Sequence, residues 1–251
     1  MNNTLIDNSI EALSMTATLR KCLDIDGIQT VSIATGYWDI PGLAILQKSL
    51  RSFIEKDGTT LRLLIGKDPY IYANQLKSPK YKDSNYPLDF IKTDIHELNV
   101  TEEYKDAIRL LLDYCSKSND SKIQIRVFRK NANDETQFLH SKCYIFDGKQ
   151  NGIGIGIVGS TNFTQKGLQG NAELNYIETA PNQVLSLDAI PGNKSHLLWF
   201  NEKWEISEPW NEQFLEQVLK SAPITDEVEK ERKNEKLPFT CRLYTSDAAD
   251  D

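Results

Sequence analysis

The stretch from Phe138 to Glu173 constrains this chain more than any other part of its sequence. Apolar and polar residues alternate over 137–146, which predicts a β-strand. Side chains two residues apart on a strand point to the same face, so the imidazole of His140 and the cation of Lys142 are expected to lie side by side. The sequence therefore predicts a basic surface along one face of this strand.

A turn over 147–152 and a second strand over 153–158 are predicted next. The turn opens with an Asp-Gly pair and closes with an Asn-Gly pair, and the strand alternates isoleucine with glycine. Glycines within a strand leave room for another backbone or a ligand to approach closely, although a simple bulge is the plainer interpretation. A hairpin of this kind would return Ser160 and Asn162 towards His140.

Together these residues form an ordered pattern of His-x-Lys, an aspartate, Gly-Ser-x-Asn and Asn-x-Glu. Its named positions are His140, Lys142, Asp147, Gly159, Ser160, Asn162, Asn171 and Glu173. The pattern resembles the phospholipase D superfamily, in the form found in its bacterial nucleases. A looser similarity covers 33–43 and 61–69, which look like the amino-terminal domain of phospholipase D-like restriction enzymes and of helicases carrying such a domain. The resemblance implies an α/β fold, an α/β/α sandwich with a mixed sheet.

The resemblance also implies a set of catalytic roles without a metal ion or cofactor. His140 would attack phosphorus to give a phosphohistidine, which water then hydrolyses. Lys142 and Asn162 would hold the non-bridging oxygens, the first by charge and the second by an N–H donor. Ser160 would support the same phosphate, and Glu173 would accept a hydrogen bond from a histidine ring nitrogen. Asp147 can equally be a turn residue, and Ser160 can simply cap a turn.

This chemistry needs two histidines, one neutral to attack phosphorus and one protonated to donate to the leaving oxygen. The chain contains three, and neither His96 nor His196 is followed two residues later by a lysine. One motif per chain therefore predicts a homodimer with a composite active site on a two-fold axis. The need for two protonation states also predicts a bell-shaped dependence of the rate on pH.

Three functions are weighed on this basis. The first is a metal-independent endonuclease domain that acts on DNA and belongs to a restriction enzyme or a defence helicase. The second is a phospholipase D-like lipid phosphodiesterase without a membrane anchor, and the third is a non-catalytic DNA-recognition module of a larger helicase. The sequence does not separate the first from the third.

The net charge of −7 differs from the basic balance typical of nucleic-acid-binding proteins. Residues 201–251 hold 13 acidic and 7 basic residues, so residues 1–200 carry only about −1. Within 61–82 five basic residues, Arg62 among them, stand against a single aspartate. Such a cluster could face a phosphate backbone, although solvated loop lysines are the simpler interpretation.

No apolar run reaches the roughly 18 residues of a membrane span, and the amino terminus has no signal-peptide layout. A cytoplasmic protein without a membrane partner is therefore expected. The four cysteines are scattered without CxxC spacing, which favours reduced thiols over a zinc site or a disulfide framework.

Three segments are predicted along the chain. Residues 1–221 are expected to form the phospholipase D-like nuclease domain. Residues 222–241 have almost no apolar periodicity and are interpreted as a charged linker. Residues 242–251 resemble the translation of a sequencing adapter and are expected to be non-native, so the protein is expected to continue differently, and a helicase or other effector domain could follow.

The remaining secondary structure is predicted from periodicity and capping. Helices are expected over 8–22, from Pro41, over 88–95 and from Thr101, and strands over 28–35, 60–66, 122–128 and 172–179. The strand, helix, strand succession over 28–66 predicts a parallel pair with a right-handed crossover.

Aromatic residues supply the last candidates. Tyr37, Trp38 and Lys67 follow predicted strands, where ligand sites of α/β sheets gather. Three tryptophans, Trp199, Trp204 and Trp210, could stack on bases, but at helical spacing they are interpreted as core.

Overall fold

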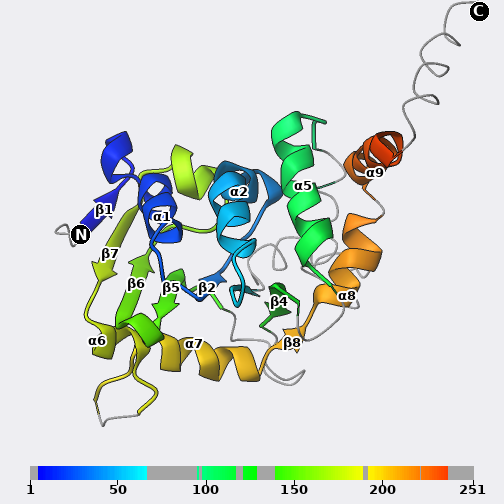
Figure 1. Ribbon diagram of the computed structural model, residues 1–251. Coiled ribbons are helices and arrows are strands. Elements are labelled where there is room, and N and C mark those ends of the chain that lie inside the picture. The colour runs from blue at the N-terminus through cyan, green and yellow to red at the C-terminus, as the bar shows by residue number, and fades with distance from the viewer. Residues whose placement is uncertain are drawn as a thin grey trace, which may run out of the picture.

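A mixed sheet of eight strands forms the centre of the protein (Figure 1). The computed structural model describes residues 5–66, 95, 98–116, 121–128, 139–188, 192–220 and 222–236. The order of the strands across the sheet is β1-β7-β6-β5-β2-β3-β4-β8. Their bounds are Leu5–Asp7 (β1), Thr30–Thr35 (β2), Thr60–Ile65 (β3), Ile123–Val127 (β4), Cys143–Gly148 (β5), Ile153–Gly159 (β6), Leu174–Glu178 (β7) and Glu208–Pro209 (β8).

Helices cover both faces of the sheet. In Figure 1, α1, α2 and α5 lie above it, α6 and α7 lie below it, and α9 stands beside α5. The α-helices are Met15–Leu23 (α1), Ile40–Ile54 (α2), Glu102–Tyr114 (α5), Pro181–Leu185 (α6), His196–Glu205 (α7), Asn211–Gln213 (α8) and Pro223–Lys236 (α9). Short 3₁₀ and π segments are Glu11–Leu13 (η1), Lys149–Asn151 (η3), Lys166–Gly170 (η4) and Phe214–Leu219 (η5). The expected α/β/α sandwich with a mixed sheet is confirmed.

The β2–α2–β3 unit has the predicted parallel pairing. β2 and β3 pair in register from Thr30 with Thr60 to Thr35 with Ile65. Asp39 caps α2 by accepting a hydrogen bond from the amide of Gly42, and a proline stands in the first turn, where it removes no helical hydrogen bond. β5 runs antiparallel to β2 and pairs with β6 as the predicted hairpin.

Two apolar layers hold the sandwich together. The larger layer joins the sheet to α1, α2 and α5 and includes Tyr144 and Phe146, and the smaller joins it to α6 and α7 and includes Cys143 and Ile145. Alternate residues of β5 therefore belong to opposite layers, as a strand buried on both faces requires.

Two boundaries near the amino terminus and the motif differ from the prediction. The helix predicted over 8–22 begins only at Met15, because Ser14 caps it by accepting from the amide of Ala17. Asp7 instead accepts from Ser9 in a local turn. The strand predicted over 137–146 begins at Cys143, so His140 and Lys142 lie in the irregular segment that enters it.

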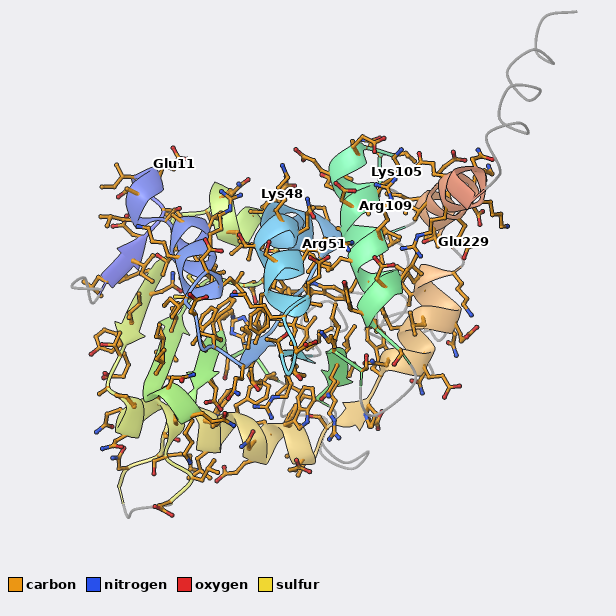
Figure 2. The ribbon with its side chains drawn as sticks, in the orientation of Figure 1. Glu11, Lys48, Arg51, Lys105, Arg109 and Glu229 are labelled. Atoms are coloured by element: carbon orange, nitrogen blue, oxygen red, sulfur yellow. The ribbon has the colours of Figure 1, made fainter. Side chains whose placement is uncertain are left out.

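The segment interpreted as a linker is instead helix α9 from residue 223 to residue 236, so that prediction is wrong there. Ile224 and Val228 are buried, and they are one helical turn apart. Glu231 forms ion pairs with Lys105 and Arg109 of α5, two cations labelled in Figure 2 on the helix next to α9. Two apolar contacts and these ion pairs fix a segment whose own periodicity is weak.

Several predictions fall outside the described residues. They concern Phe138, Lys67 with the other lysines of 61–82, Cys241, His96, the adapter-like residues 242–251 and, except for Ile95, the helix over 88–95.

Candidate functional site at the end of the sheet

The motif residues gather at one end of the sheet. β2 and β6 end there, and β5 and β7, which run the other way, begin there. The segment of His140 and Lys142 enters β5, Ser160 and Asn162 follow β6, and Glu173 precedes β7. Opposed strand directions thus bring three separate pieces of sequence to a common edge.

Asn162 is held in one orientation by the end of β2. Its Oδ1 accepts from the amide of Tyr37 at 3.1 Å and lies 3.3 Å from the hydroxyl of Thr35. The same hydroxyl accepts from the amide of Phe163 at 3.0 Å. Because Oδ1 is occupied by a backbone donor, the amide orientation is defined, and Nδ2 is the group that can donate to a ligand.

His140 is exposed and lies close to Asn162. A Cβ added to Gly36 would meet His140 Cδ2 at 3.3 Å and Asn162 Oδ1 at 3.4 Å. Gly66 makes room for the same segment, since a Cβ there would lie 1.9 Å from the carbonyl oxygen of Leu139. Two glycines at the ends of β2 and β3 therefore allow the histidine segment to cross the edge of the sheet.

Lys142 is buried, with an exposed fraction of 8%. Its ammonium group donates to the carbonyl of His140 at 2.7 Å. This bond folds the side chain back along the segment that carries the histidine. A fixed cation is therefore held at the backbone of His140, where it can attract a phosphate.

Ser160 and Glu173 form a second pair at this edge. The hydroxyl of Ser160 donates to the carboxylate of Glu173, and the Glu173 carboxylate also accepts from Asn171 Nδ2 at 3.1 Å. Both residues line a cavity of about 560 Å³ that includes Asn8 and the end of η4. The structure thus brings His140 to Asn162 and Ser160 to Glu173.

Buried contacts fix the loop that carries Ser160 and Asn162. Thr161 is fully buried, donates its amide to Asn175 Oδ1 at 3.3 Å and accepts from Asn175 Nδ2 at 2.8 Å. The hydroxyl of Tyr144 donates to the Thr161 carbonyl at 2.9 Å. Burial raises the pKa of Tyr144 well above its ordinary value, so the phenol keeps its proton.

Asp39 ties the same loop to helix α2. Its carboxylate accepts from the amide of Gly42 at 2.6 Å and from the amide of Gln165 at 3.0 Å. Burial raises the pKa of this carboxyl, and the two backbone hydrogen bonds act against that shift. A Cβ on Gly42 would lie 2.7 Å from Thr164 Cα, so helix and loop are in close contact.

The supporting residues were not identified from the sequence. Thr35 and Asp39 act through side-chain bonds to backbone amides, and Gly36 and Gly66 act by leaving room for the histidine segment; the only signal was their position just after predicted strands or before a helix. Of the aromatic candidates, Tyr37 contributes its backbone amide.

Trp38 does not line the site. It is buried against Phe214, with ring centroids 5.4 Å apart. Arg62 was expected to face phosphate. Instead its Cζ lies 4.9 Å from the centroid of the Phe200 ring, and its guanidinium group donates to Ser32 and Asn201. Neither side chain is available for the roles that the sequence suggested.

The described cysteines are buried thiols. Burial raises the pKa of each of the three described cysteines, Cys22, Cys115 and Cys143, to about 12. Within the described ranges, no three His, Cys, Asp or Glu side chains gather as a metal site would require. Among the helices that the structure describes, none has the length and apolar character to cross a bilayer.

Comparisons with solved structures give matches with TM-scores below 0.5. NucT from Helicobacter pylori matches at 14% identity with a TM-score of 0.43, over 82% of this chain and 97% of that chain. A phospholipase D family member, Nuc from Salmonella typhimurium, matches at 13% identity with a TM-score of 0.43, over 82% of this chain and 95% of that one. Polyphosphate kinase from Porphyromonas gingivalis matches at 8% identity with a TM-score of 0.36, over 70% of this chain and 20% of that enzyme.

The sequence itself matches a family model. No curated protein sequence matches the chain. The model described as "Cardiolipin synthase, PLD-like domain" matches residues 27–190, which is more than half of the 251 residues and contains every motif position. The chain therefore belongs to the PLD-like domain family and is a phosphodiesterase of the phospholipase D superfamily.

Proposed function

We propose that this chain is a metal-independent endonuclease domain that cleaves DNA phosphodiester bonds at the edge of the sheet where His140 lies. The observation that carries the proposal is the arrangement of His140, Lys142 and Asn162. The residue with the exposed imidazole accepts a backbone hydrogen bond from a buried cation, and it lies close to an amide whose oxygen is already engaged. A nucleophile with two groups suited to phosphate oxygens is what phosphoryl transfer needs.

The reaction proceeds in two steps. A neutral ring nitrogen of His140 attacks phosphorus, a P–N bond forms, and the P–O bond to the leaving nucleotide breaks. Lys142 and the Nδ2 group of Asn162 stabilise the non-bridging oxygens as their charge develops. A protonated histidine donates its proton to the leaving oxygen, and in the second step the same residue takes a proton from the water that cleaves the P–N bond.

The protonated histidine is proposed to come from a second copy of the chain. Each chain carries a single His-x-Lys motif, and a two-fold axis near this edge would face one His140 with another. Glu173 is assigned the role of accepting from a histidine ring nitrogen, with Ser160 holding its carboxylate. The pH–rate profile is expected to be bell-shaped, since one imidazole must be neutral and the other charged.

The homodimer has its own test. A mixture of His140→Ala and Glu173→Ala chains would form heterodimers. Their shared site lacks His140 from one chain and Glu173 from the other, and so differs from the site of either parent. Sedimentation should give twice the chain mass for the wild type. A monomer that retains full activity would exclude a composite site.

The function is tested by cutting plasmid and single-stranded DNA in EDTA with the wild type and with His140→Ala. We expect the wild type to cut in EDTA and the variant to bind DNA without cutting it. Binding by both without cutting would identify a recognition module, of the kind that could serve a restriction enzyme or a helicase. Hydrolysis of phospholipid vesicles without DNA cleavage would identify a lipid phosphodiesterase.

A further inference from the structure

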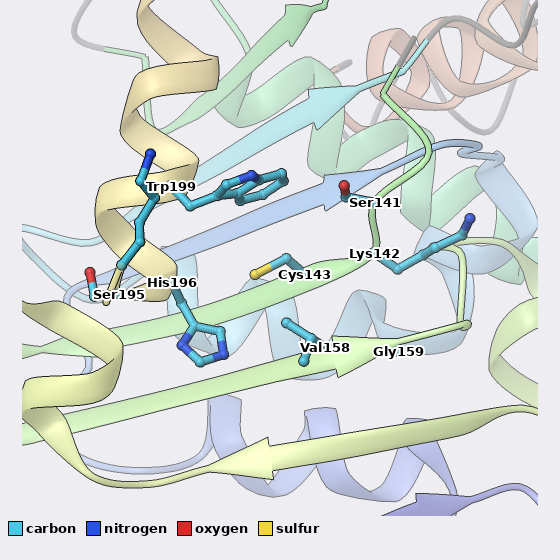
Figure 3. A pocket seen from close by; sticks show the side chains of 9 residues that line it. Ser141, Lys142, Cys143, Val158, Gly159, Ser195, His196 and Trp199 are labelled. Atoms are coloured by element: carbon cyan, nitrogen blue, oxygen red, sulfur yellow. The ribbon is translucent and has the colours of Figure 1, made fainter. Parts of the chain in front are cut away.

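A cavity of about 420 Å³ lies at the start of β5 and includes Lys142 in its lining. Its floor comes from β5 and β6, and its wall from the first turns of α7 (Figure 3). Figure 3 shows the Lys142 side chain pointing away from Trp199 and His196. The residues that line the cavity are Ser141, Lys142, Cys143, Val158, Gly159, Lys194, Ser195, His196 and Trp199.

The lining of the cavity is aromatic and apolar, with polar groups at its rim. Trp199 is half-buried, and Val158 is 36% exposed although it lies within a central strand. Lys194 is paired with Glu202 at 2.6 Å, so its charge is largely balanced. Lys142, whose side chain points away from Trp199, is suited to a phosphate, whereas the indole face of Trp199 suits a planar ring.

Its position relates the cavity to the proposed reaction centre. Ser141 lines it, and the neighbours of Ser141 in sequence are His140 and Lys142. Consecutive Cα atoms are about 3.8 Å apart, so the mouth of the cavity and the catalytic imidazole are within the reach of one nucleotide.

We propose that this cavity binds a nucleobase of the strand being cut, stacked on the indole of Trp199, while the adjoining phosphate lies at His140. The inference rests on the proposed function and deepens it, because a base that enters a cavity must leave the duplex. The substrate is therefore single-stranded or locally unpaired nucleic acid. An acyl chain would fill the apolar floor but would offer no hydrogen-bonding group to the rim of the cavity.

The local structure permits this role for Trp199. It lies on the second turn of α7, whose buried side rests on Phe200 and Trp204. Those two rings stack on each other with centroids 5.5 Å apart and anchor the helix to the sheet. Trp199 can therefore change without removing the side chains that hold α7 in place.

The test compares Trp199→Leu with Trp199→Phe, which keeps an aromatic face. Two substrates are used, single-stranded oligothymidylate and the base-free diester methyl p-nitrophenyl phosphate. We expect the leucine variant to lose roughly 5- to 150-fold in kcat/KM on the oligonucleotide, the range that corresponds to losing one stacked base. Hydrolysis of the base-free diester should stay unchanged, and the phenylalanine variant should recover most of the loss.

Other outcomes would overturn the inference. An equal loss on both substrates would mean that Trp199 supports the fold or the reaction centre, and no loss on either would mean that no base enters. A loss confined to phosphatidylglycerol vesicles would assign the cavity to an acyl chain.

A binding measurement decides the inference separately from the reaction. Fluorescence anisotropy with His140→Ala protein compares labelled oligothymidylate with an abasic strand of the same length. Tighter binding of the thymidine strand that disappears in the Trp199→Leu double variant supports the base site, and equal binding of both strands overturns it. If the wild type hydrolyses neither substrate, the proposed function fails, while this measurement still answers the question of the base site.

Discussion

The two sides of the segment that enters β5 differ in how their functional side chains are assembled. On the side of Lys142, the candidate catalytic residues all come from the motif stretch 140–173, and Asn162 is held by the backbone amide of Tyr37, just after β2. On the side of Ser141, the cavity is completed by α7, which lies beyond the whole motif in the sequence. A reaction fixes residue types and their spacing, whereas a recognition surface needs only a suitable face that many segments could supply.

Asn162→Asp should impair the candidate catalytic residues on the Lys142 side and leave the cavity on the Ser141 side unchanged. The aspartate keeps an oxygen for the Tyr37 amide but replaces the Nδ2 donor with a second negative oxygen. Loss of one donor to a developing charge costs about 10²- to 10³-fold in kcat, and the new charge repels phosphate. We expect that loss on oligothymidylate and on methyl p-nitrophenyl phosphate alike.

The matched control for this substitution is Asn182→Asp, which makes the same change at an exposed position of α6. It should leave kcat within a few-fold of the wild type. Near-normal hydrolysis by Asn162→Asp would contradict the role given to the amide.

Gly66→Ala tests whether activity depends on the path of the segment that carries His140 across the edge of the sheet. The added methyl group would lie 1.9 Å from the Leu139 carbonyl oxygen, so the segment that carries His140 must move. Overpacking of this kind costs about 1–3 kcal/mol of stability, and a misplacement near 1 Å can cost about 10²-fold in rate. Denaturant unfolding and kcat measure the two effects.

Gly170→Ala is its control, since the nearest atom to a Cβ there lies 4.0 Å away. Wild-type activity in Gly66→Ala would show that the imidazole does not depend on this crossing.

Asp39→Ala removes the link between α2 and the loop of Asn162. Loss of the helix cap should lower the free energy of unfolding by about 1 kcal/mol. Because the amide of Gln165 loses its partner, the loop is no longer fixed in position, and kcat is expected to fall about 10-fold. Asp39→Asn keeps an acceptor oxygen and should recover most of both losses. Equal kcat in the wild type, Asp39→Ala and Asp39→Asn would show that Asp39 acts only as a helix cap.

Glu231→Gln should affect stability and leave catalysis unchanged, since α9 lies against α5, away from the motif edge. The hydrogen bond from Lys105 holds the pKa of Glu231 below its ordinary value. A lowered pKa in the folded state means that its contribution is present above the unfolded pKa and is lost as pH falls through the folded pKa. The variant should therefore have a lower Tm than the wild type at pH 7, with the difference shrinking towards pH 3.

Glu229→Gln, on the exposed side of α9, should leave Tm unchanged at both pH values. A Tm difference for Glu231→Gln that does not vary with pH would show that the ion pair is not its cause.

The sequence allowed prediction of the sheet architecture and of the motif edge, because both follow from local signals. β-branched runs, capping residues and the ordered His, Lys, Ser, Asn and Glu positions each carry a physical reason within a few residues. It did not reveal that Gly66 makes room for Leu139, because that contact joins distant segments.

The failures share the same origin. The segment that became α9 has few apolar residues of its own and depends on the cations of α5. Trp199 lines a cavity while Trp204 and Trp210 are core, although all three are tryptophans of one segment. Tertiary contacts decided these cases, and no local pattern encodes them.

The most direct test of the central claim compares two histidines on opposite sides of the β5 entry segment. Hydrolysis of methyl p-nitrophenyl phosphate is measured in EDTA for the wild type, His140→Ala and His196→Ala. We predict that His140→Ala loses at least about 10³-fold in kcat, as expected for removal of a nucleophile, and that His196→Ala stays within a few-fold of the wild type. Activity that survives in His140→Ala, or disappears in His196→Ala alone, would contradict the assignment of the reaction centre.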